Sequence, residues 1–194
     1  MKTIVLASNN LHKVKEFQEM LPNYEIKALK DIDFHDDILE DGNTFFENSY
    51  IKAKTVSQFL KEKKIECDVI ADDSGLCVNA LDGAPGIHSA RFGGDHSNEA
   101  NREKLRNELK NKKDRSAYFF CQIVLLHPDG SYEEFTGKTD GEISLEEKGN
   151  KDFCYDCMFY SYDLGKTFGE ATEEEKNSVS HRGRAIEELK KRLV

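Results

Sequence analysis

The sequence predicts an α/β fold with a mixed β-sheet, and three observations support this. Strand-like apolar segments alternate with helix-like segments in the first half of the chain, as in parallel βαβ units. A long β-rich run follows at residues 116–127, and Pro128-Asp129-Gly130 then predicts a hairpin turn into a second alternating segment. No repeat, linker or low-complexity tract interrupts the 194 residues, so we expect one domain, residues 1–194, with room for two lobes.

The first half of the chain predicts a regular succession of strands and helices. Strand patterns cover residues 2–8, 24–29 and 68–73. The helix expected over 9–21 has one apolar face, formed by Leu11, Val14, Phe17 and Leu21. A capping box at Thr44 and Glu47 starts the next helix, whose core stripe is Phe46, Tyr50, Ala53, Val56 and Leu60.

The remaining elements follow from turn and capping signals. Ser74-Gly75 predicts a turn after the strand at 68–73, with a further strand at 76–81. Ser97 or Asn98 would cap a charged helix that runs to about Lys110. A second capping box at Thr172 and Glu175 starts a short helix, and Ser180 caps a last helix with Ala185, Leu189 and Leu193 on one face.

Charge and cysteine usage restrict the class of protein. The net charge of −9 argues against a non-specific binder of nucleic acid or membrane surface, because both need a basic face. No apolar run approaches the roughly 20 residues that a membrane span needs. Five scattered cysteines favour a reduced, cytoplasmic protein. Cys154 and Cys157 form a lone C-x-x-C, which we interpret as two packed thiols rather than a metal or redox site.

Two adjacent carboxylates, Asp72 and Asp73, are the first candidate for chemistry. They follow a buried strand pattern and precede Ser74, and ligand crevices of α/β sheets form at the carboxyl ends of strands. Magnesium prefers one or two carboxylates together with phosphate oxygens and water. One carboxylate could hold the metal while the other takes a proton from water. A polar strand end that leads into a turn is the alternative.

Two further sites could bind phosphate. Residues 8–13 (Ser-Asn-Asn-Leu-His-Lys) join a strand to a helix, where backbone N–H groups and the helix dipole favour an anion within reach of Lys13. Asn48 and Lys52 are four residues apart on one helix flank, and Glu40 precedes that helix. A solvated strand–turn–helix and a solvated helix face remain the alternatives.

A fourth constellation lies near the end of the chain. Ser180 is the expected cap, so His181 and Arg182 fall in the first turn of the last helix, and Lys176 lies just upstream. Both first-turn side chains can donate hydrogen bonds to a carbonyl or a phosphate. An exposed helix start is the alternative.

Four segments together resemble the inosine triphosphate pyrophosphatase family in order and spacing. They are SNNLHKVKE, LEDGNTFFENSYIKA, ADDSGLCVNALDGAPGIHSARF and SVSHRGRA, and the resemblance extends over residues 3–189. It implies an elongated mixed α/β fold in which two lobes surround a central nucleotide-binding cleft, and a homodimer. It also implies Mg²⁺-dependent hydrolysis of ITP, dITP and XTP to the monophosphate and pyrophosphate.

The resemblance also implies roles for individual residues. Glu40, Asp72 and Asp73 would handle the metal and water, with Asp73 as the proton acceptor. The triphosphate would contact Ser8, Asn9, Asn10, Lys13, Lys52 and Ser74. The nucleotide site would also include Phe153, Tyr155, Asp156, Lys176, His181 and Arg182, with Phe153 stacked on the base.

The chain departs from the family pattern in three places, and one is the glycine-rich lead-in to the aromatic motif, which here reads Gly149-Asn-Lys-Asp. Asn9 stands where the family often has glycine, and we expect it to tolerate the left-handed backbone there. Cys154 and Cys157 replace a glycine and a proline of the aromatic motif. Two alternatives therefore stay open: a pyrophosphatase for other nucleotides such as dTTP or UTP, and a nucleotide-binding regulator without turnover.

Overall fold

The computed structural model describes residues 1–94 and 96–193 and shows a mixed β-sheet flanked by helices. The strand order in the sheet is β2-β1-β3-β4-β5-β6-β7. The strands are β1 (Lys2–Leu6), β2 (Tyr24–Lys27), β3 (Asp68–Val78), β4 (Ser116–Leu126), β5 (Tyr132–Ile143), β6 (Phe159–Ser161) and β7 (Lys166–Thr167). The α-helices are α1 (Leu11–Met20), α2 (Phe45–Glu62), α3 (Asn98–Leu109), α4 (Glu173–Val179) and α5 (His181–Leu193).

The chain divides into two compact units. Unit 1 comprises Met1–Asp73, Gln122–Thr136 and Ala185–Val194, and unit 2 comprises Ser74–Cys121 and Gly137–Arg184. Each has its own apolar core: Val5, Ala53 and Val69 belong to that of unit 1, and Leu105, Phe119 and Phe159 to that of unit 2. The single domain expected from the sequence stays a prediction.

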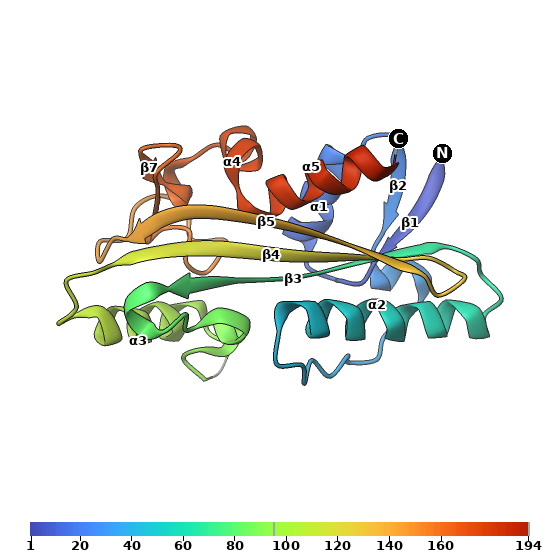
Figure 1. Cartoon of the computed structure of the whole chain (residues 1–194), viewed down its shortest axis with the longest axis horizontal. Helices are drawn as coiled ribbons and strands as arrows, with labels where there is room; N and C mark the ends of the chain where they lie inside the picture. The colour runs from blue at the N-terminus through green and yellow to red at the C-terminus, as the bar shows by residue number, and fades with distance from the viewer. Residues whose placement is uncertain (95, 194) are drawn as a thin grey trace. The chain divides into compact units, whose positions relative to one another are not determined.

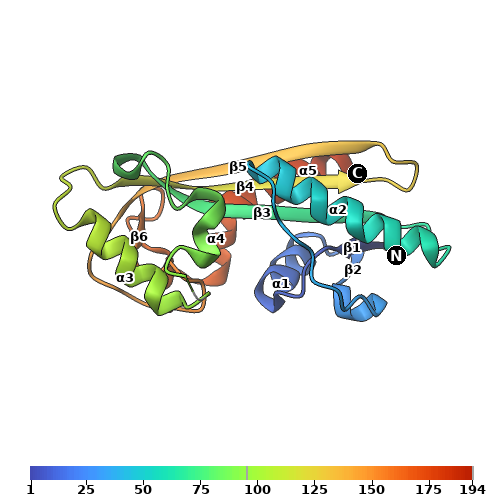
Figure 2. The same ribbon diagram turned by 90° about the horizontal axis from the view of Figure 1, so that it is seen from below.

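The parallel strands of unit 1 place their two helices on opposite faces. β1 pairs in parallel with β2 on one side and with β3 on the other. Parallel crossovers are right-handed, so the connections to the two neighbours of β1 pass over opposite faces of the sheet. Figure 1 shows α1 and α2 on these two faces, and α2 lies in front of the strands when unit 1 is seen from below (Figure 2). Side chains that alternate along β3 can therefore meet different helices.

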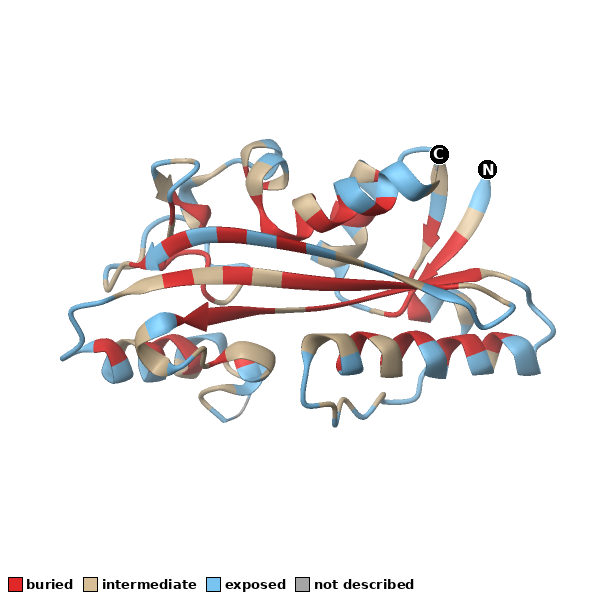
Figure 3. Ribbon diagram, in the orientation of Figure 1, coloured by how far each residue is buried: buried red, intermediate tan, exposed pale blue. Residues whose placement is uncertain are grey.

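The second half of the sheet is antiparallel. β6 pairs antiparallel with both β5 and β7. The turn after β4 is confirmed, because the His127 N–H donates to the Ser131 carbonyl and Gly130 adopts φ 91°. Burial alternates along β5, whereas nearly all of β3 is buried (Figure 3). Side chains of a strand that is buried on both faces are not solvated. The carboxylates of β3 therefore need ion-pair or hydrogen-bond partners within the protein.

Most predicted elements are present, and several boundaries were wrong. The largest difference concerns β3. The sequence predicted that this strand ends in a turn at Ser74-Gly75, but β3 continues through both residues to Val78. Gly75 is required for another reason: a Cβ there would lie 2.2 Å from the carbonyl oxygen of Gly86. The small residue therefore marks a close backbone approach, not a chain reversal.

Capping and helix faces were partly predicted. Thr44 and Ser97 cap their helices, and the capping box of Thr172 with Glu175 is confirmed. At the start of α2 the Glu47 carboxylate accepts the N–H of Asn43 instead of that of Thr44. Leu11, expected on the apolar face of α1, is 63% exposed. Among the described residues, no helix has both the length and the hydropathy to cross a membrane.

Candidate functional site

Asp72 and Asp73 lie inside β3, not at its carboxyl end as the sequence predicted. Successive side chains of a strand point to opposite faces. Accordingly, Asp72 bonds to Lys13 on α1, whereas Asp73 bonds to Asn48 on α2. Asp72 and Asp73 are 2% and 9% exposed and β3 continues past them, so the alternative of a polar strand end that leads into a turn is wrong. The strand itself divides the pair between two different environments.

Asp73 belongs to a group that we call the Asp73 cluster, formed by Asn48, Lys52 and Asp73, which are buried, and Glu40, which is partly exposed. Asn48 Nδ2 donates to Asp73 Oδ2 over 3.1 Å. Lys52 Nζ lies 2.9 Å from Glu40 Oε2 and 3.9 Å from Asp73 Oδ1. Asn48 and Lys52 are one helical turn apart on α2, as their spacing predicted. Two carboxylates from distant parts of the sequence thus face one ammonium group.

Burial and charge oppose each other in the Asp73 cluster. Burial raises the pKa of Asp73 above its ordinary value, and the attraction of Lys52 and the hydrogen bond from Asn48 only partly offset this. Burial alone would lower the pKa of Lys52, but the attraction of Asp73, Asp72 and Glu40 outweighs it and raises that pKa. Lys52 is therefore a permanent cation beside a carboxylate that accepts a proton more readily than an ordinary aspartate.

Lys13 occupies the position expected from the sequence, but the helix start around it is capped. Its Nζ lies 3.0 Å from Asp72 Oδ1. Asn10 Oδ1 accepts the N–H groups of His12 and Lys13, and Ser8 Oγ accepts that of Asn10. Some of the backbone donors predicted to meet an anion are thus already satisfied from within the chain. The ammonium of Lys13 is the stronger candidate for a phosphate contact.

Asn9 does not adopt the left-handed backbone that was expected at a position where the family often has glycine. Its Oδ1 accepts the N–H of Lys30, which ties the turn before α1 to the segment after β2. In the part of the chain that the structure describes, the non-glycine residues with positive φ are Asp33, Lys64, Asp82 and His96. The expected left-handed backbone at Asn9 is therefore wrong, and its side chain holds a loop in place.

A second group of predicted residues gathers in unit 2, and we call Phe153, Asp156, Lys176, His181 and Arg182 the Lys176 cluster. The ammonium of Lys176 bonds to Asp156 Oδ2 and lies 3.7 Å from the centre of the Phe153 ring. The guanidinium of Arg182 lies 5.9 Å from the same ring. A partly exposed aromatic ring over two cations offers one flat face and several hydrogen-bond donors.

His181 and Arg182 are buried, so the alternative of an exposed helix start is wrong. The His181 ring stacks on Phe119 with a centroid distance of 4.7 Å and an interplanar angle of 14°. Arg182 Nη2 donates to Ser74 Oγ over 3.4 Å. The stacking holds the imidazole in one plane, which favours directional hydrogen bonding.

Tyr155 does not join the Lys176 cluster. It is 3% exposed, packs in the core of unit 2, and donates its hydroxyl to the Ser89 carbonyl over 2.8 Å. Its hydroxyl is thus bonded within the core of unit 2, and Tyr155 is not one of the proposed substrate contacts. Cys157 packs in the same core and the Cys154 thiol, whose pKa burial raises to about 11, lies 3.5 Å from the Asn98 carbonyl. Both cysteines pack as the sequence analysis expected.

Magnesium fits the donor atoms of the Asp73 cluster. The carboxylates of Glu40 and Asp73 already face a single cation, Lys52, and magnesium takes one or two carboxylates together with phosphate oxygens and water. The charge of Asp72 also acts on Lys52, although its own bond goes to Lys13. Within residues 1–94 and 96–193, no three His, Cys, Asp or Glu side chains gather closely enough to form a complete metal site.

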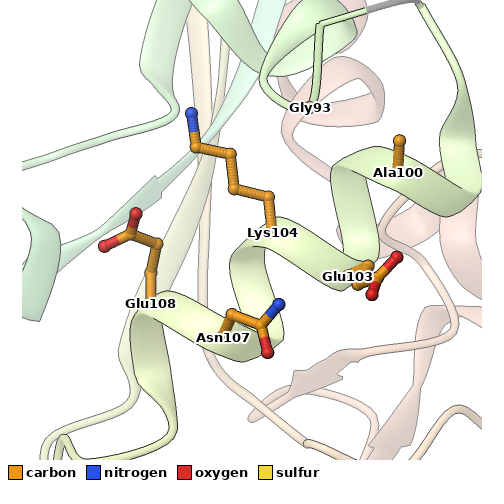
Figure 4. A pocket seen from close by; sticks show the side chains of 6 residues that line it. All are labelled: Gly93, Ala100, Glu103, Lys104, Asn107 and Glu108. Atoms are coloured by element: carbon orange, nitrogen blue, oxygen red, sulfur yellow. The ribbon is translucent and has the colours of Figure 1, made fainter.

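Two features of these clusters are not predictable from the sequence. The spacing of Asn48 places it beside Lys52 on the helix flank but does not indicate that its side chain reaches Asp73. Phe119 lies in the long β-rich run and carried no signal of a role beside His181. An open pocket of about 490 Å³ beside α3 is separate from the predicted residues (Figure 4); Gly93, Ala100, Glu103, Lys104, Asn107 and Glu108 line it.

Comparisons with known proteins cover nearly the whole chain. Residues 4–192 match the sequence model of the Ham1 family. A dITP/XTP pyrophosphatase of Clostridium perfringens is 48% identical over 199 residues, which cover 100% of this chain and 98% of the relative. One of Treponema denticola is 47% identical over 187 residues, 94% of each chain. The structure of the Staphylococcus aureus Ham1 protein has a TM-score of 0.87 and 41% identity, covering 99% of this chain and 98% of that one.

Proposed function

The chain belongs to the Ham1 family, and on that premise we propose that it hydrolyses the non-canonical purine nucleotides dITP, XTP and ITP to the monophosphate and pyrophosphate. Its Clostridium perfringens and Treponema denticola relatives are named dITP/XTP pyrophosphatases. The observation that carries the proposal is the Asp73 cluster, in which a buried carboxylate of raised pKa lies beside a lysine and a second carboxylate. Such perturbed, partnered groups are typical of catalytic sites.

Asp73 is the proton acceptor in the proposed reaction. A water molecule attacks the α-phosphorus and transfers a proton to the Asp73 carboxylate. The bond between the α-phosphorus and the oxygen that bridges to the β-phosphorus breaks, and its electron pair leaves with pyrophosphate. A raised pKa makes Asp73 a stronger base than an exposed aspartate, provided that it is ionised.

Lysines offset the charge of the triphosphate. A nucleoside triphosphate carries about four negative charges, which are stabilised best by fixed cations in a site that needs no reorganisation. Lys52 is 8% exposed and held by Glu40, so its ammonium is already positioned. Lys13 on α1 is the second proposed cation for the phosphates. The remaining proposed phosphate contacts are Ser8, Asn9, Asn10 and Ser74.

We propose Mg²⁺ as the cofactor, held by Glu40 and Asp73, with the charge of Asp72 adding to the attraction. When bound, the ion neutralises charge that develops on the phosphate oxygens. Glu40 and Asp73 keep their orientation through Lys52 and Asn48, so the chain presents both carboxylates before any ligand arrives.

The Lys176 cluster is the proposed site for the base. Phe153 offers a ring on which a purine can stack, and Asp156 with Lys176 can pair with polar groups at the purine edge. His181 and Arg182 are donors, and hypoxanthine and xanthine carry a 6-oxo acceptor where adenine carries an amino donor. Adenine would leave buried donors unpaired, at a cost of about 1–3 kcal/mol for each group.

A substrate panel tests the proposal. Steady-state release of pyrophosphate would be measured with ITP, dITP, XTP, GTP, ATP, dTTP and UTP, with and without Mg²⁺. We expect turnover of the first three that depends on the metal and exceeds that of ATP. Preference for dTTP or UTP would favour the second enzymatic hypothesis, and binding of ITP without turnover would favour a regulator. We also propose a homodimer located in the cytoplasm, as the family resemblance implies.

A further inference from the structure

We propose that Asn48 is a positioning residue whose amide links the loop that carries Glu40 to Asp73, so that both carboxylates face Lys52. The inference rests on the proposed function, because it concerns the orientation of the proposed catalytic carboxylate. Asn48 is not among the residues proposed to touch the metal or the substrate. Its effect passes through the two groups that it holds.

Both ends of the Asn48 side chain are used. Its Oδ1 accepts the backbone N–H of Gly42 over 2.9 Å, and its Nδ2 donates to Asp73 Oδ2 over 3.1 Å. The orientation of the amide follows from chemistry, because only the NH₂ can donate to a carboxylate and only the carbonyl oxygen can accept an N–H. The side chain is 1% exposed, so water is not at hand to replace either partner.

The loop before α2 is shaped to receive this amide. A Cβ at Gly42 would lie 2.7 Å from Asn48 Oδ1 and equally close to the Cβ of Glu47, so a larger residue requires the loop to move. The next residue is tied as well, since the Asn43 N–H donates to the Glu47 carboxylate. Glu40 precedes Gly42 by two residues, so its backbone is anchored close to Lys52.

The alternative is that Asn48 only stabilises the fold. A buried amide with two partners contributes to stability in any case. The specific feature is the identity of the partners: one is the proposed proton acceptor and the other belongs to the loop of its companion carboxylate. Ser49, the next residue on α2, is equally buried, but its hydroxyl donates to the Gln122 carbonyl over 3.0 Å. It supplies a matched control.

The first test compares Asn48→Ala with Ser49→Ala in the full chain. We expect kcat for ITP with Mg²⁺ to fall about 10- to 100-fold in Asn48→Ala, as is typical when a group that orients a ligand is lost, with KM changed far less. Ser49→Ala should keep the kcat of the unmodified chain even if its melting temperature falls. Equal losses of kcat in the two variants, or an unchanged kcat in Asn48→Ala, would overturn the inference.

A second test is independent of activity. Amide hydrogen exchange of Gly42, measured by NMR without nucleotide or metal, should be at least about tenfold faster in Asn48→Ala and unchanged in Ser49→Ala. Asn48→Asp keeps an acceptor for Gly42 but loses the donor to Asp73. In this variant the Gly42 amide should stay protected from exchange, and kcat for ITP should still fall. If Asn48→Ala fails to fold, Gly42→Ala tests the same link from the loop side and should lower kcat.

The two tests separate failure of the inference from failure of the proposed function. If the unmodified chain hydrolyses none of the nucleotides, the proposed function fails, whereas protection of the Gly42 amide still reports on the link. If the unmodified chain is active and exchange at Gly42 does not respond to Asn48→Ala, the inference is wrong and the proposed function stands.

Discussion

At the scale of single residues, the two aspartates of β3 show how an extended backbone separates neighbours. Asp72 meets Lys13, whereas Asp73 meets Asn48 and Lys52. Burial raises the pKa of Asp73, and the attraction of Lys52 and the hydrogen bond from Asn48 offset this only in part. Two adjacent carboxylates can thus hydrogen-bond to side chains on two different helices.

Asp73→Asn is expected to lower ITP turnover by at least two orders of magnitude, in the range of about 10²–10⁴ for loss of a general base. The fold should survive, because the amide oxygen introduced by this substitution can still accept from Asn48, and Lys52 keeps Glu40. Steady-state kinetics and thermal melts of both proteins check this. Unchanged turnover would remove Asp73 from the mechanism.

Arg182→Ala is expected to impair ITP hydrolysis more than ATP hydrolysis, roughly 10- to 100-fold in kcat/KM, because the lost donor is the one proposed to pair with the 6-oxo group of hypoxanthine. Arg182 is preferable to His181 for this test, because truncation of a ring stacked on Phe119 would also disturb the core. The ratio of kcat/KM for the two nucleotides is the measurement. Equal losses would mean that the guanidinium contacts phosphate.

At the scale of elements, the corner between α4 and α5 positions three members of the Lys176 cluster. α4 carries Lys176, and α5 begins with His181 and Arg182. Ser180 stands between the helices and accepts the N–H of Gly183. The helices approach so closely that a Cβ at Gly183 would lie 1.9 Å from the Asn177 carbonyl oxygen.

Gly183→Ala should therefore displace the start of α5 and weaken the preference for ITP over ATP. The clash is with backbone, which cannot rotate away as a side chain can. Gly130→Ala is a control of comparable kind: it introduces strain at φ 91° in the β4–β5 turn, about 1 kcal/mol, but meets no neighbouring atom. Kinetics on both nucleotides should separate the two variants. If Gly183→Ala keeps the preference for ITP over ATP, a displaced start of α5 does not disturb the Lys176 cluster and the prediction is wrong.

At the scale of the whole molecule, a chain of charges in unit 1 joins segments that are far apart in the sequence. Asp68 on β3 bonds to Lys2 on β1 and to His127 Nδ1, 2.6 and 2.9 Å away. His127 Nε2 faces Glu133 over 3.2 Å, and Glu133 in turn bonds to Arg192 on α5. The hydrogen bond to Asp68, aided by Glu133, raises the pKa of His127 above its ordinary value near 6.5 despite partial burial.

This network makes part of the stability depend on pH. A histidine whose pKa is raised by folding stabilises the protein fully below the unfolded pKa, and that contribution is lost as pH rises through the folded pKa. His127→Gln should therefore lower the melting temperature more at about pH 6 than at about pH 9. The exposed His35→Gln is the control. An effect of His127→Gln that is equal at both pH values would contradict the role of the charged imidazole.

Patterns that depend on short stretches were predictable. The helix caps at Thr44, Ser97 and Thr172 depend on a few neighbouring residues, and all three are confirmed. The resemblance to the inosine triphosphate pyrophosphatase family is confirmed by the Ham1 family match, since motif order and spacing are properties of the sequence itself. The turn expected at Ser74-Gly75 was wrong because glycine serves equally for a turn and for close packing against another backbone.

The sequence by itself determined the α/β class, the order of most elements, the family, and which residue types could bind a nucleotide and a cation. Only the tertiary structure decided which of them meet: it separated Asp72 from Asp73, brought Asn48 to Asp73, buried His181 against Phe119 and placed Tyr155 in the core. The physical reason is that caps and apolar periodicity arise within one or two turns of chain. The direction of a buried side chain depends instead on strand continuity and on packing partners tens of residues away.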